Sequence, residues 1–478
     1  MNQSSAIYQN EKGLVLKMDS IIKGGTLVTA DEKFVADIGI ENGKIKLIGR
    51  DLTANSSTEI IDASGKLVMP GMIDAHVHLS LPFCGTISAD SFETGTRAAA
   101  AGGVTTVVDF AIQAKGSPIK EAIMNRKAQA EGEVHVDYSL HGGITDWNES
   151  TRTELSEIIN GGISSFKMFM IYRSEGWLAT DPMLIEALEE TKKLGGMIQV
   201  HAESVDLLDS LIAKHHTEEE MKKHGAWLHV VTRPNIIEAE AIQRAITWAE
   251  YTGGHLYIVH MSTGEGTDLV QAAKARGVNV VAETCPQYLH LNEEVFKGEN
   301  GHLYATCPQI KSTKDGQRLW RGLQEGTVQT VGTDTCTFNT EQKAMWEGDF
   351  TKIPFGLPGT ELMLPLLYDG VRAGKIDLNK MVEVASTNPA KVYGMYPTKG
   401  SLTPGADADI VIFDTEKEVT VDYRQMETNC DWSPFQGKQL KGYPYLTLCR
   451  GTVVGKEGKC IGEKGYGKFV KRGHSGAF

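Results

Sequence analysis

The sequence predicts a parallel eight-stranded (β/α)8 barrel joined to a small β module that both ends of the chain build together. Two observations support this fold class. Through the middle of the chain, apolar strands alternate with amphipathic helical stretches, which is typical of a parallel sheet. At both ends, short strands are separated by turn residues, as in antiparallel hairpins. The length of 478 residues also fits one large barrel plus a smaller module.

The β module is predicted from segments of similar texture at the two ends of the chain. These segments are Ser20–Val28, Ala36–Ile40, Lys44–Gly49, Asp409–Asp414, Val419–Val421 and Tyr445–Val454. Neither end has enough strands to bury a face alone, so we expect the two sets to pair into one unit. The expected boundaries are residues 1–68 for the N-terminal part of the module, 69–395 for the barrel, and 396–478 for the C-terminal part and tail.

Eight barrel strands are expected in the middle of the chain. They are Leu67–Val77, Val104–Phe110, Val136–Leu140, Ser165–Met170, Met197–His201, Leu256–His260, Val278–Glu283 and Thr327–Gly332. Amphipathic segments such as Asp181–Leu194 and Ile236–Tyr251 separate most of them and are expected to form helices. Eight such units over about 300 residues fit a closed TIM barrel better than an open sheet.

Composition limits the classes of partner. Lysine and arginine number 48 against 61 aspartate and glutamate residues, a net charge of −13, which argues against a nucleic acid or an acidic membrane as partner. The seven cysteines are scattered and odd in number, as expected for reduced thiols and not for a disulfide framework. The N-terminal residues lack the basic and apolar blocks of a signal peptide, and no apolar run approaches the ~18 residues of a membrane span. We therefore expect a cytoplasmic protein.

Potential metal ligands recur at the ends of the predicted strands. His76 and His78 are two positions apart, so on a strand they point to the same face and can hold one ion. Four further residues stand within or just after other strands: Lys167, His201, His260 and Asp334. Active sites of this fold lie at the carboxyl ends of the strands, so one face would receive all six residues.

Each residue of this set has a simpler interpretation when taken alone. A histidine at a strand end is often a hydrogen-bonded structural residue, Asp334 could be a helix N-cap, and Lys167 could extend to solvent. Together the six residues predict a site for two divalent ions, and imidazole and carboxylate ligands suit zinc. An ammonium cannot ligate a metal, but a buried neutral lysine could react with carbon dioxide to give an anionic carbamate able to bridge two ions.

Seven motifs carry a resemblance to a known family. They are His76-Val-His78, Phe-Lys167-Met-Phe-Met-Ile-Tyr, Gln-Val-His201-Ala-Glu, Val-His260-Met-Ser, Glu-Thr-Cys-Pro-Gln-Tyr-Leu289, Gly-Thr-Asp334-Thr-Cys-Thr-Phe-Asn and Ser401-Leu-Thr-Pro-Gly-Ala-Asp-Ala-Asp-Ile-Val. From about residue 19 to residue 470 the chain resembles the hydantoinase and dihydropyrimidinase family of cyclic amidohydrolases. The resemblance implies a distorted TIM barrel, a β-sandwich made from both termini, and a homotetramer.

The resemblance also implies a role for each site residue. His76 and His78, with Asp334, would bind the more buried ion, and His201 and His260 the other. Lys167, as N6-carboxylysine, would bridge them. Tyr172 would hydrogen-bond the developing oxyanion, and Asp334 would pass a proton to the departing ring nitrogen. The substrate would be a small cyclic amide, a hydantoin or a dihydropyrimidine, opened to an N-carbamoyl amino acid.

The chain departs from the family pattern around the expected substrate contacts. Where relatives carry Ser-Pro-Pro-(Leu/Ile)-Arg, this chain has Cys307-Pro-Gln-Ile-Lys311, and where they carry Pro-Asn-Gly it has Pro354-Phe355-Gly356. Cys307 and Phe355 are therefore the expected substrate-binding positions, and Phe355 with the loop from Leu81 suggests an apolar wall. The family's Asp-His after the last strand is Asp334-Thr335 here.

These departures leave the metal ligands unchanged and leave other functions open. Allantoinase or dihydroorotase chemistry would keep the metals and change the ring. A different class is the non-catalytic scaffold proteins related to dihydropyrimidinase, which have lost metal ligands. In this chain all six ligand positions are filled, which favours an enzyme.

Overall fold

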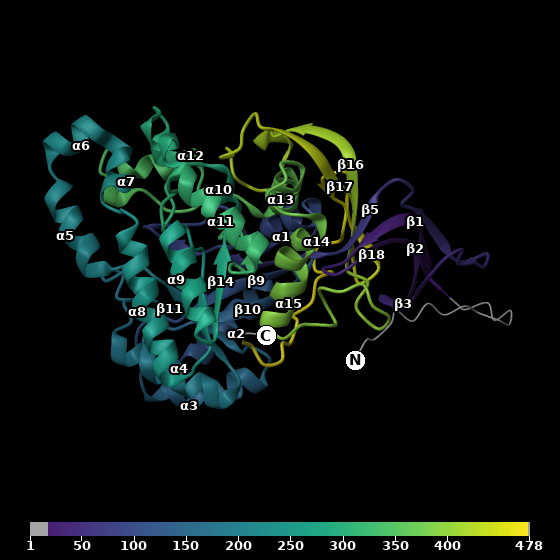
Figure 1. The fold of residues 1–478 in the computed structure, drawn as a ribbon, viewed down its shortest axis with the longest axis horizontal. Helices are drawn as coiled ribbons and strands as arrows, with labels where there is room; N and C mark the ends of the chain where they lie inside the picture. Colours follow the sequence, from purple (N-terminus) through teal and green to yellow (C-terminus); the bar gives the residue numbers. More distant parts are fainter. Residues whose placement is uncertain (1–17, 477–478) are drawn as a thin grey trace.

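The structure is a computed structural model and describes residues 18–476, and Figure 1 shows a helix-rich part beside a smaller part made of strands. The helix-rich part is built on eight parallel strands in the order β15-β14-β13-β12-β11-β10-β9-β6. Their bounds are β6 Met72–Val77, β9 Val104–Ile112, β10 Asp137–Gly143, β11 Ser165–Phe169, β12 Met197–His201, β13 Leu256–Ile258, β14 Val280–Thr284 and β15 Thr330–Val331. The sheet closes where His78 N donates to Thr335 O at 2.8 Å, beside a parallel bridge from Val77 to Thr335. The predicted eight-stranded barrel is confirmed.

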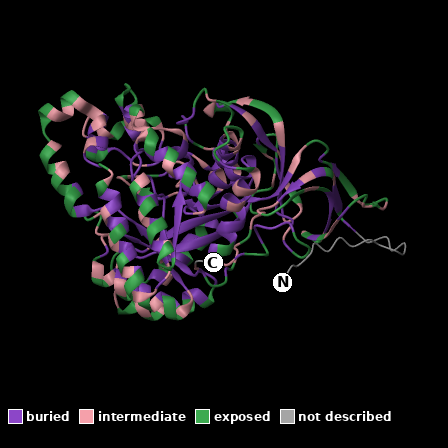
Figure 2. Ribbon diagram, viewed as in Figure 1, coloured by how far each residue is buried: buried purple, intermediate pink, exposed green. Residues whose placement is uncertain are grey.

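Helices surround this barrel and turn their apolar faces inward, as the buried inner and exposed outer surfaces in Figure 2 show. The longer ones are α1 Phe92–Ala101, α2 Ile119–Ala130, α3 Glu149–Asn160, α4 Asp181–Leu194, α5 Val205–His215, α8 Ile236–Thr252, α9 Gly264–Ala275, α11 Thr313–Glu325 and α13 Met363–Arg372. The helix predicted at Asp181–Leu194 is α4, which begins with Pro182 in its first turn and ends at Gly195, a left-handed residue with φ of 73°. The other predicted helix is α8, which extends one residue further than expected.

Shorter elements connect the longer ones. The helices are α6 Glu218–His224, α7 Leu228–Val231, α10 Pro286–His290, α12 Thr340–Lys343, α14 Leu378–Val382 and α15 Asn388–Val392. A two-stranded ribbon, β7 Pro82–Phe83 with β8 Thr86–Ile87, follows the first barrel strand. No helix in residues 18–476 is long and apolar enough to cross a bilayer.

The smaller part is one nine-stranded sheet, largely antiparallel, that combines both ends of the chain. Its strands are β1 Ser20–Val28, β2 Lys33–Glu41, β3 Lys44–Gly49, β4 Glu59–Asp62, β5 Leu67–Pro70, β16 Ile410–Thr420, β17 Gln439–Cys449, β18 Thr452–Lys456 and β19 Lys459–Cys460. The two ends join where β5 pairs antiparallel with β16, with Val68 opposite Ile412. Buried aliphatic side chains from both ends, including Ile22, Ile38 and Leu448, form a core of its own. The predicted pairing of the two ends is confirmed.

The segment expected as a single strand at Leu67–Val77 is two strands, and that expectation was wrong. The chain bends at Gly71, so that β5 belongs to the smaller sheet and β6 to the barrel. A Cβ at Gly71 would overlap the side chain of Thr105, so only glycine permits this close approach. Gly71 N also donates to Asp409 O at 2.8 Å. The strand that carries His76 is therefore anchored directly to the smaller sheet.

Candidate active site and metal centre

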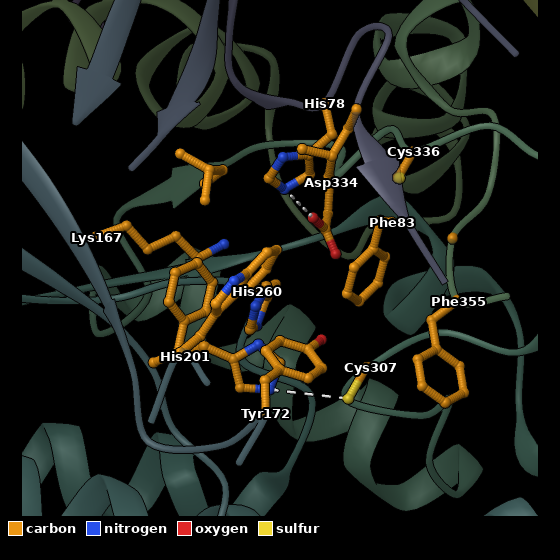
Figure 3. A pocket seen from close by; sticks show the side chains of 15 residues that line it. His78, Phe83, Lys167, Tyr172, His201, His260, Cys307, Asp334, Cys336 and Phe355 are labelled. Carbon is orange, nitrogen blue, oxygen red and sulfur yellow. Dashed lines mark hydrogen bonds and ion pairs between the residues drawn. The ribbon is translucent and has the colours of Figure 1, made fainter. Parts of the chain in front are cut away.

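The structure brings all six predicted ligand residues to one end of the barrel. His76 lies near the end of β6, Lys167 within β11 and His201 at the last position of β12. His78, His260 and Asp334 follow the ends of β6, β13 and β15. Five of the six line one pocket, shown in Figure 3, and His76 is fully buried next to them.

His76, His78 and Asp334 form the deeper group. Asp334 Oδ1 lies 3.0 Å from His76 Nε2 and 3.3 Å from His78 Nε2. Burial opposes ionisation of Asp334, but the two imidazoles outweigh it and hold the pKa of the carboxyl well below its usual range. His76 Nδ1 is already used, because it donates to Glu283 Oε1 at 2.6 Å. His76 Nε2, His78 Nε2 and the Asp334 carboxylate therefore face one another, and a divalent cation could be held by all three.

Lys167 lies beside this group with almost no access to solvent. Its side chain is 2% exposed, and its Nζ lies 3.0 Å from His76 Nε2 and 4.5 Å from the centre of the Phe110 ring. Burial lowers the pKa of the lysine, although Asp334 and Glu283 oppose the shift. The lowered pKa favours the neutral amine that carbamate formation requires.

His201 and His260 form the second group, with Tyr172 beside them. The two imidazole ring centres are 4.5 Å apart, and the Tyr172 ring lies 5.2 Å from that of His201. Burial lowers the pKa of both histidines, so they are neutral, the form that binds metals. Within residues 18–476, Nδ1 of His78 and Nδ1 of His260 are buried without a hydrogen-bond partner. The donor set fits a divalent metal centre, because it offers neutral imidazoles, a carboxylate and unsatisfied ring nitrogens.

Three of the site residues hold a left-handed backbone conformation that side chains other than glycine rarely adopt. The φ angles are 60° at Tyr172, 37° at His260 and 54° at Asp334. Each such residue costs of order 1–3 kcal/mol, which the surrounding fold must offset. The conformational energy of these three residues is offset by the rest of the barrel, and such strained residues are common at functional sites.

Two buried glutamates orient the histidines, and the sequence analysis gave neither of them a role. Glu283 lies one residue before the end of β14 and also accepts from His260 N at 2.9 Å. Glu203 accepts from His201 Nε2 at 2.7 Å, which leaves Nδ1 of His201 for another partner. Burial opposes ionisation of Glu203, but His201 and Arg233 lower its pKa to about 2. Metal-binding histidines commonly donate their second ring nitrogen to a carboxylate. The sequence offered two such carboxylates, because the predicted strand Val278–Glu283 ends in Glu283 and because Glu203 lies two residues after His201.

The pocket walls are largely apolar. Phe83 stacks on Trp177 with ring centres 5.7 Å apart, and Leu81 and Ile112 line the same space. Phe355 contacts the His229 ring, 5.0 Å away, and the guanidinium of Arg233, 5.3 Å away, and these two groups are themselves hydrogen-bonded. Figure 3 shows the Tyr172 hydroxyl in the open space between Phe83 and Cys307. A wider cleft shares Phe83, Tyr172 and Phe355 with this pocket and opens to solvent.

The three departures from the family pattern have different surroundings. Cys307 lines the pocket, and its thiol donates to Glu203 Oε2 at 2.9 Å. Burial raises the pKa of Cys307 well above its usual range, so the thiol is protonated and a poor nucleophile. Thr335 does not line the pocket. Its hydroxyl accepts from Thr360 N at 3.0 Å, beside the hydrogen bond that closes the barrel.

Comparisons with known proteins show the family of this chain. The model of the amidohydrolase family matches residues 67–454. The D-hydantoinase of Geobacillus stearothermophilus is 40% identical over 469 residues, which cover 96% of this chain and 98% of that protein. A D-phenylhydantoinase of Escherichia coli is 36% identical over 460 residues, covering 95% and 98%.

A solved structure extends the likeness to the fold. The crystal structure of the dihydropyrimidinase from Brevibacillus agri is 39% identical and superimposes with a TM-score of 0.93, covering 95% of this chain and 99% of that one. Sequence and overall fold are therefore similar over nearly the whole length. The chain belongs to the hydantoinase and dihydropyrimidinase branch of the amidohydrolase family, whose members carry a divalent metal centre.

Proposed function

We propose that this protein hydrolyses the ring C–N bond of a hydantoin or a dihydropyrimidine and releases an N-carbamoyl amino acid. The observation that carries the proposal is the complete ligand set around one pocket, with Tyr172 at its mouth. Relatives named D-hydantoinase, at about 40% identity over nearly the full length, support the same activity. The non-catalytic scaffold alternative is disfavoured, because it requires a broken ligand set.

We infer that His76, His78 and Asp334 hold one ion and that His201 and His260 hold the second. Lys167 would bridge the two as N6-carboxylysine, which requires one carbon dioxide per chain. Zinc suits this mixture of imidazole and carboxylate ligands. When bound, the two ions would supply the Lewis acidity and the activated water that amide hydrolysis requires.

The remaining steps fall to side chains of this chain. The Tyr172 hydroxyl, whose pKa burial raises well above its usual value, keeps its proton and can donate a hydrogen bond to the carbonyl oxygen as it gains charge. The Asp334 carboxylate can receive a proton and return it to the ring nitrogen as the C–N bond breaks. The rings of Phe83 and Phe355 would exclude water from the substrate.

The apolar walls favour a ring with an aromatic or aliphatic substituent. Phe83, Trp177 and Phe355 offer ring faces to such a group. The D-phenylhydantoinase relative supports this choice. Allantoin or dihydroorotate would bring a polar or charged substituent into the same apolar space, at a cost in desolvation.

The test is hydrolysis of hydantoin, phenylhydantoin, dihydrouracil and allantoin by the purified, zinc-loaded protein. We expect ring opening of phenylhydantoin with the highest kcat/KM. Absence of turnover with all four compounds, despite a full metal content, would contradict the proposed activity. Turnover of allantoin alone would favour the allantoinase alternative. The homotetrameric state and the cytoplasmic location stay predictions.

A further inference from the structure

A fully buried lysine lies behind the pocket wall, outside the metal centre. Lys343 is the last residue of α12, and its side chain is 0% exposed. Its Nζ donates to two backbone carbonyls, Pro354 O at 2.6 Å and Ala305 O at 3.1 Å. Within residues 18–476, no carboxylate forms an ion pair with it.

The two carbonyls belong to the two chain segments that carry the departures from the family pattern. Ala305 precedes Cys307 by two residues, and Pro354 directly precedes Phe355. The segments also bond to each other, because Gly356 N donates to Ala305 O at 2.9 Å. Ala305 O thus accepts from both Gly356 N and Lys343 Nζ. Because Lys343 Nζ also donates to Pro354 O, the lysine links the Cys307 segment to the Phe355 segment by hydrogen bonds to both.

Hydrogen bonds to the C-terminal segment anchor the helix that carries Lys343. Thr340, at the start of α12, donates from N and Oγ1 to the two carboxylate oxygens of Asp431, at 2.8 and 2.6 Å. Trp432 Nε1 donates to Phe338 O at 2.8 Å. The rings of Phe338 and Trp432 face Nζ with centres 5.9 and 6.0 Å away. The C-terminal segment with Asp431 and Trp432 therefore holds α12 in place, and with it the amine of Lys343.

We propose that Lys343 is a positioning residue that sets the separation of the Cys307 and Phe355 segments and thereby controls substrate binding, not the metal chemistry. This inference rests on the proposed function. A buried amine without a carboxylate partner is costly, and an apolar side chain of the same length would fill the space without that cost. What the lysine adds is its N–H donors.

The electrostatic surroundings agree with this role. Burial lowers the pKa of Lys343 to about 7, and the titratable groups that interact with it are the thiols of Cys84, Cys336 and Cys430 and the rings of His229 and His302. All of these are neutral near pH 7, so none of them competes for the N–H donors as an ion pair would. The donors are available to the carbonyls.

The test compares Lys343→Met with the matched control Lys274→Met. Lys274 also donates to two carbonyls, Gly326 O at 3.0 Å and Thr327 O at 3.3 Å, but from α9 on the outer side of the barrel. For Lys343→Met we expect KM for phenylhydantoin to rise about tenfold while kcat stays within about threefold and the metal content is unchanged. The control should leave all three unchanged. An unchanged KM in Lys343→Met, or a loss of metal and kcat together, would overturn the proposal.

A second readout does not depend on the substrate. Alkylation of Cys307 and Cys336 by iodoacetamide, followed by mass spectrometry, should be about tenfold faster in Lys343→Met, with fully buried Cys449 as the internal reference. Equal rates in the variant and the wild type would overturn the proposal. If the wild type opens none of the four rings, the proposed function fails. The alkylation rates still decide whether Lys343 holds the Cys307 and Phe355 segments together.

A donor-retaining variant covers the case in which Lys343→Met is poorly folded, as judged by its thermal midpoint against that of Lys274→Met. Lys343→Arg keeps N–H donors at this position. Its alkylation rate should lie nearer the wild type than that of Lys343→Met. A rate equal to that of the methionine variant would mean that the donors do not hold the segments.

Discussion

Glu283 accepts a hydrogen bond from His76 Nδ1 at 2.6 Å, although 207 positions separate the two residues in the sequence. The bond joins β6 to β14, which lies two strands away around the closed barrel. The same oxygen accepts from the backbone N of His260 at 2.9 Å, and the other accepts from the Tyr257 hydroxyl at 2.8 Å. One buried acid therefore orients a residue from each of the two histidine groups.

Replacing Glu283 with glutamine should weaken metal retention. The amide carries no charge and makes His76 a less basic ligand, so we expect the affinity for metal to fall about 10–100-fold and kcat/KM to fall with it. The measurement is metal content after dialysis against increasing chelator concentrations. Loss of metal at the same chelator concentration as in the wild type would remove Glu283 from the support of the site.

Glu361→Gln provides the matched control for that variant. Glu361 is also a buried glutamate, 2% exposed, but it lies outside the pocket and accepts from Glu427 N at 2.7 Å. Burial, with the nearby Glu427 carboxylate, raises its pKa to about 8, so it is already neutral at pH 7. The glutamine variant should therefore retain metal and activity.

The raised pKa of Glu361 also predicts how stability depends on pH. Between about pH 4.5 and pH 8 the folded state keeps this proton and the unfolded state loses it, so the wild-type free energy of unfolding should decrease as the pH rises through this window. The contribution approaches ~1.4 kcal/mol per pH unit for one proton. Urea unfolding at pH 5 and pH 8 should show a smaller decrease in Glu361→Gln than in the wild type. Equal decreases would mean that Glu361 is ionised in the fold.

Tyr172→Phe removes one hydroxyl from the pocket. If that hydroxyl stabilises the oxyanion, kcat should fall about 10²–10³-fold, while KM and metal content change little. The left-handed backbone at Tyr172, with φ of 60°, is the same for both residues, so folding should be retained. Steady-state kinetics and metal analysis on the same sample decide the matter. An unchanged kcat would remove Tyr172 from the mechanism.

The barrel and the metal ligands could be predicted because their signals are local in the sequence. Alternating apolar strands and helices define the (β/α) units, and the strand periodicity places His76 and His78 on one face. The rule that strand ends converge then brings Lys167, His201 and Asp334 to the same place. None of these steps requires knowing which side chains touch.

The parts that were missed depend on contacts between distant segments. The break at Gly71 follows from the approach of Thr105 on a neighbouring strand, which no pattern within residues 67–77 reveals. The role of Glu283 depends on its strand facing His76 across the closed barrel. Lys343 stands in a short polar helix, where a lysine is usually solvated, and its full burial depends on distant segments such as that of Trp432, which the helix pattern does not reveal.

The most direct test of the account is the metal content and activity of Lys167→Ala, measured beside Lys274→Ala, a lysine remote from the pocket. Since the carbamate on Lys167 would bridge both ions, we expect this variant to lose bound zinc and phenylhydantoin hydrolysis together, while the control keeps both. In the wild type, reconstitution of metal-free protein with zinc should then be faster with added bicarbonate. Full zinc content and wild-type turnover in Lys167→Ala would contradict the bridged metal centre.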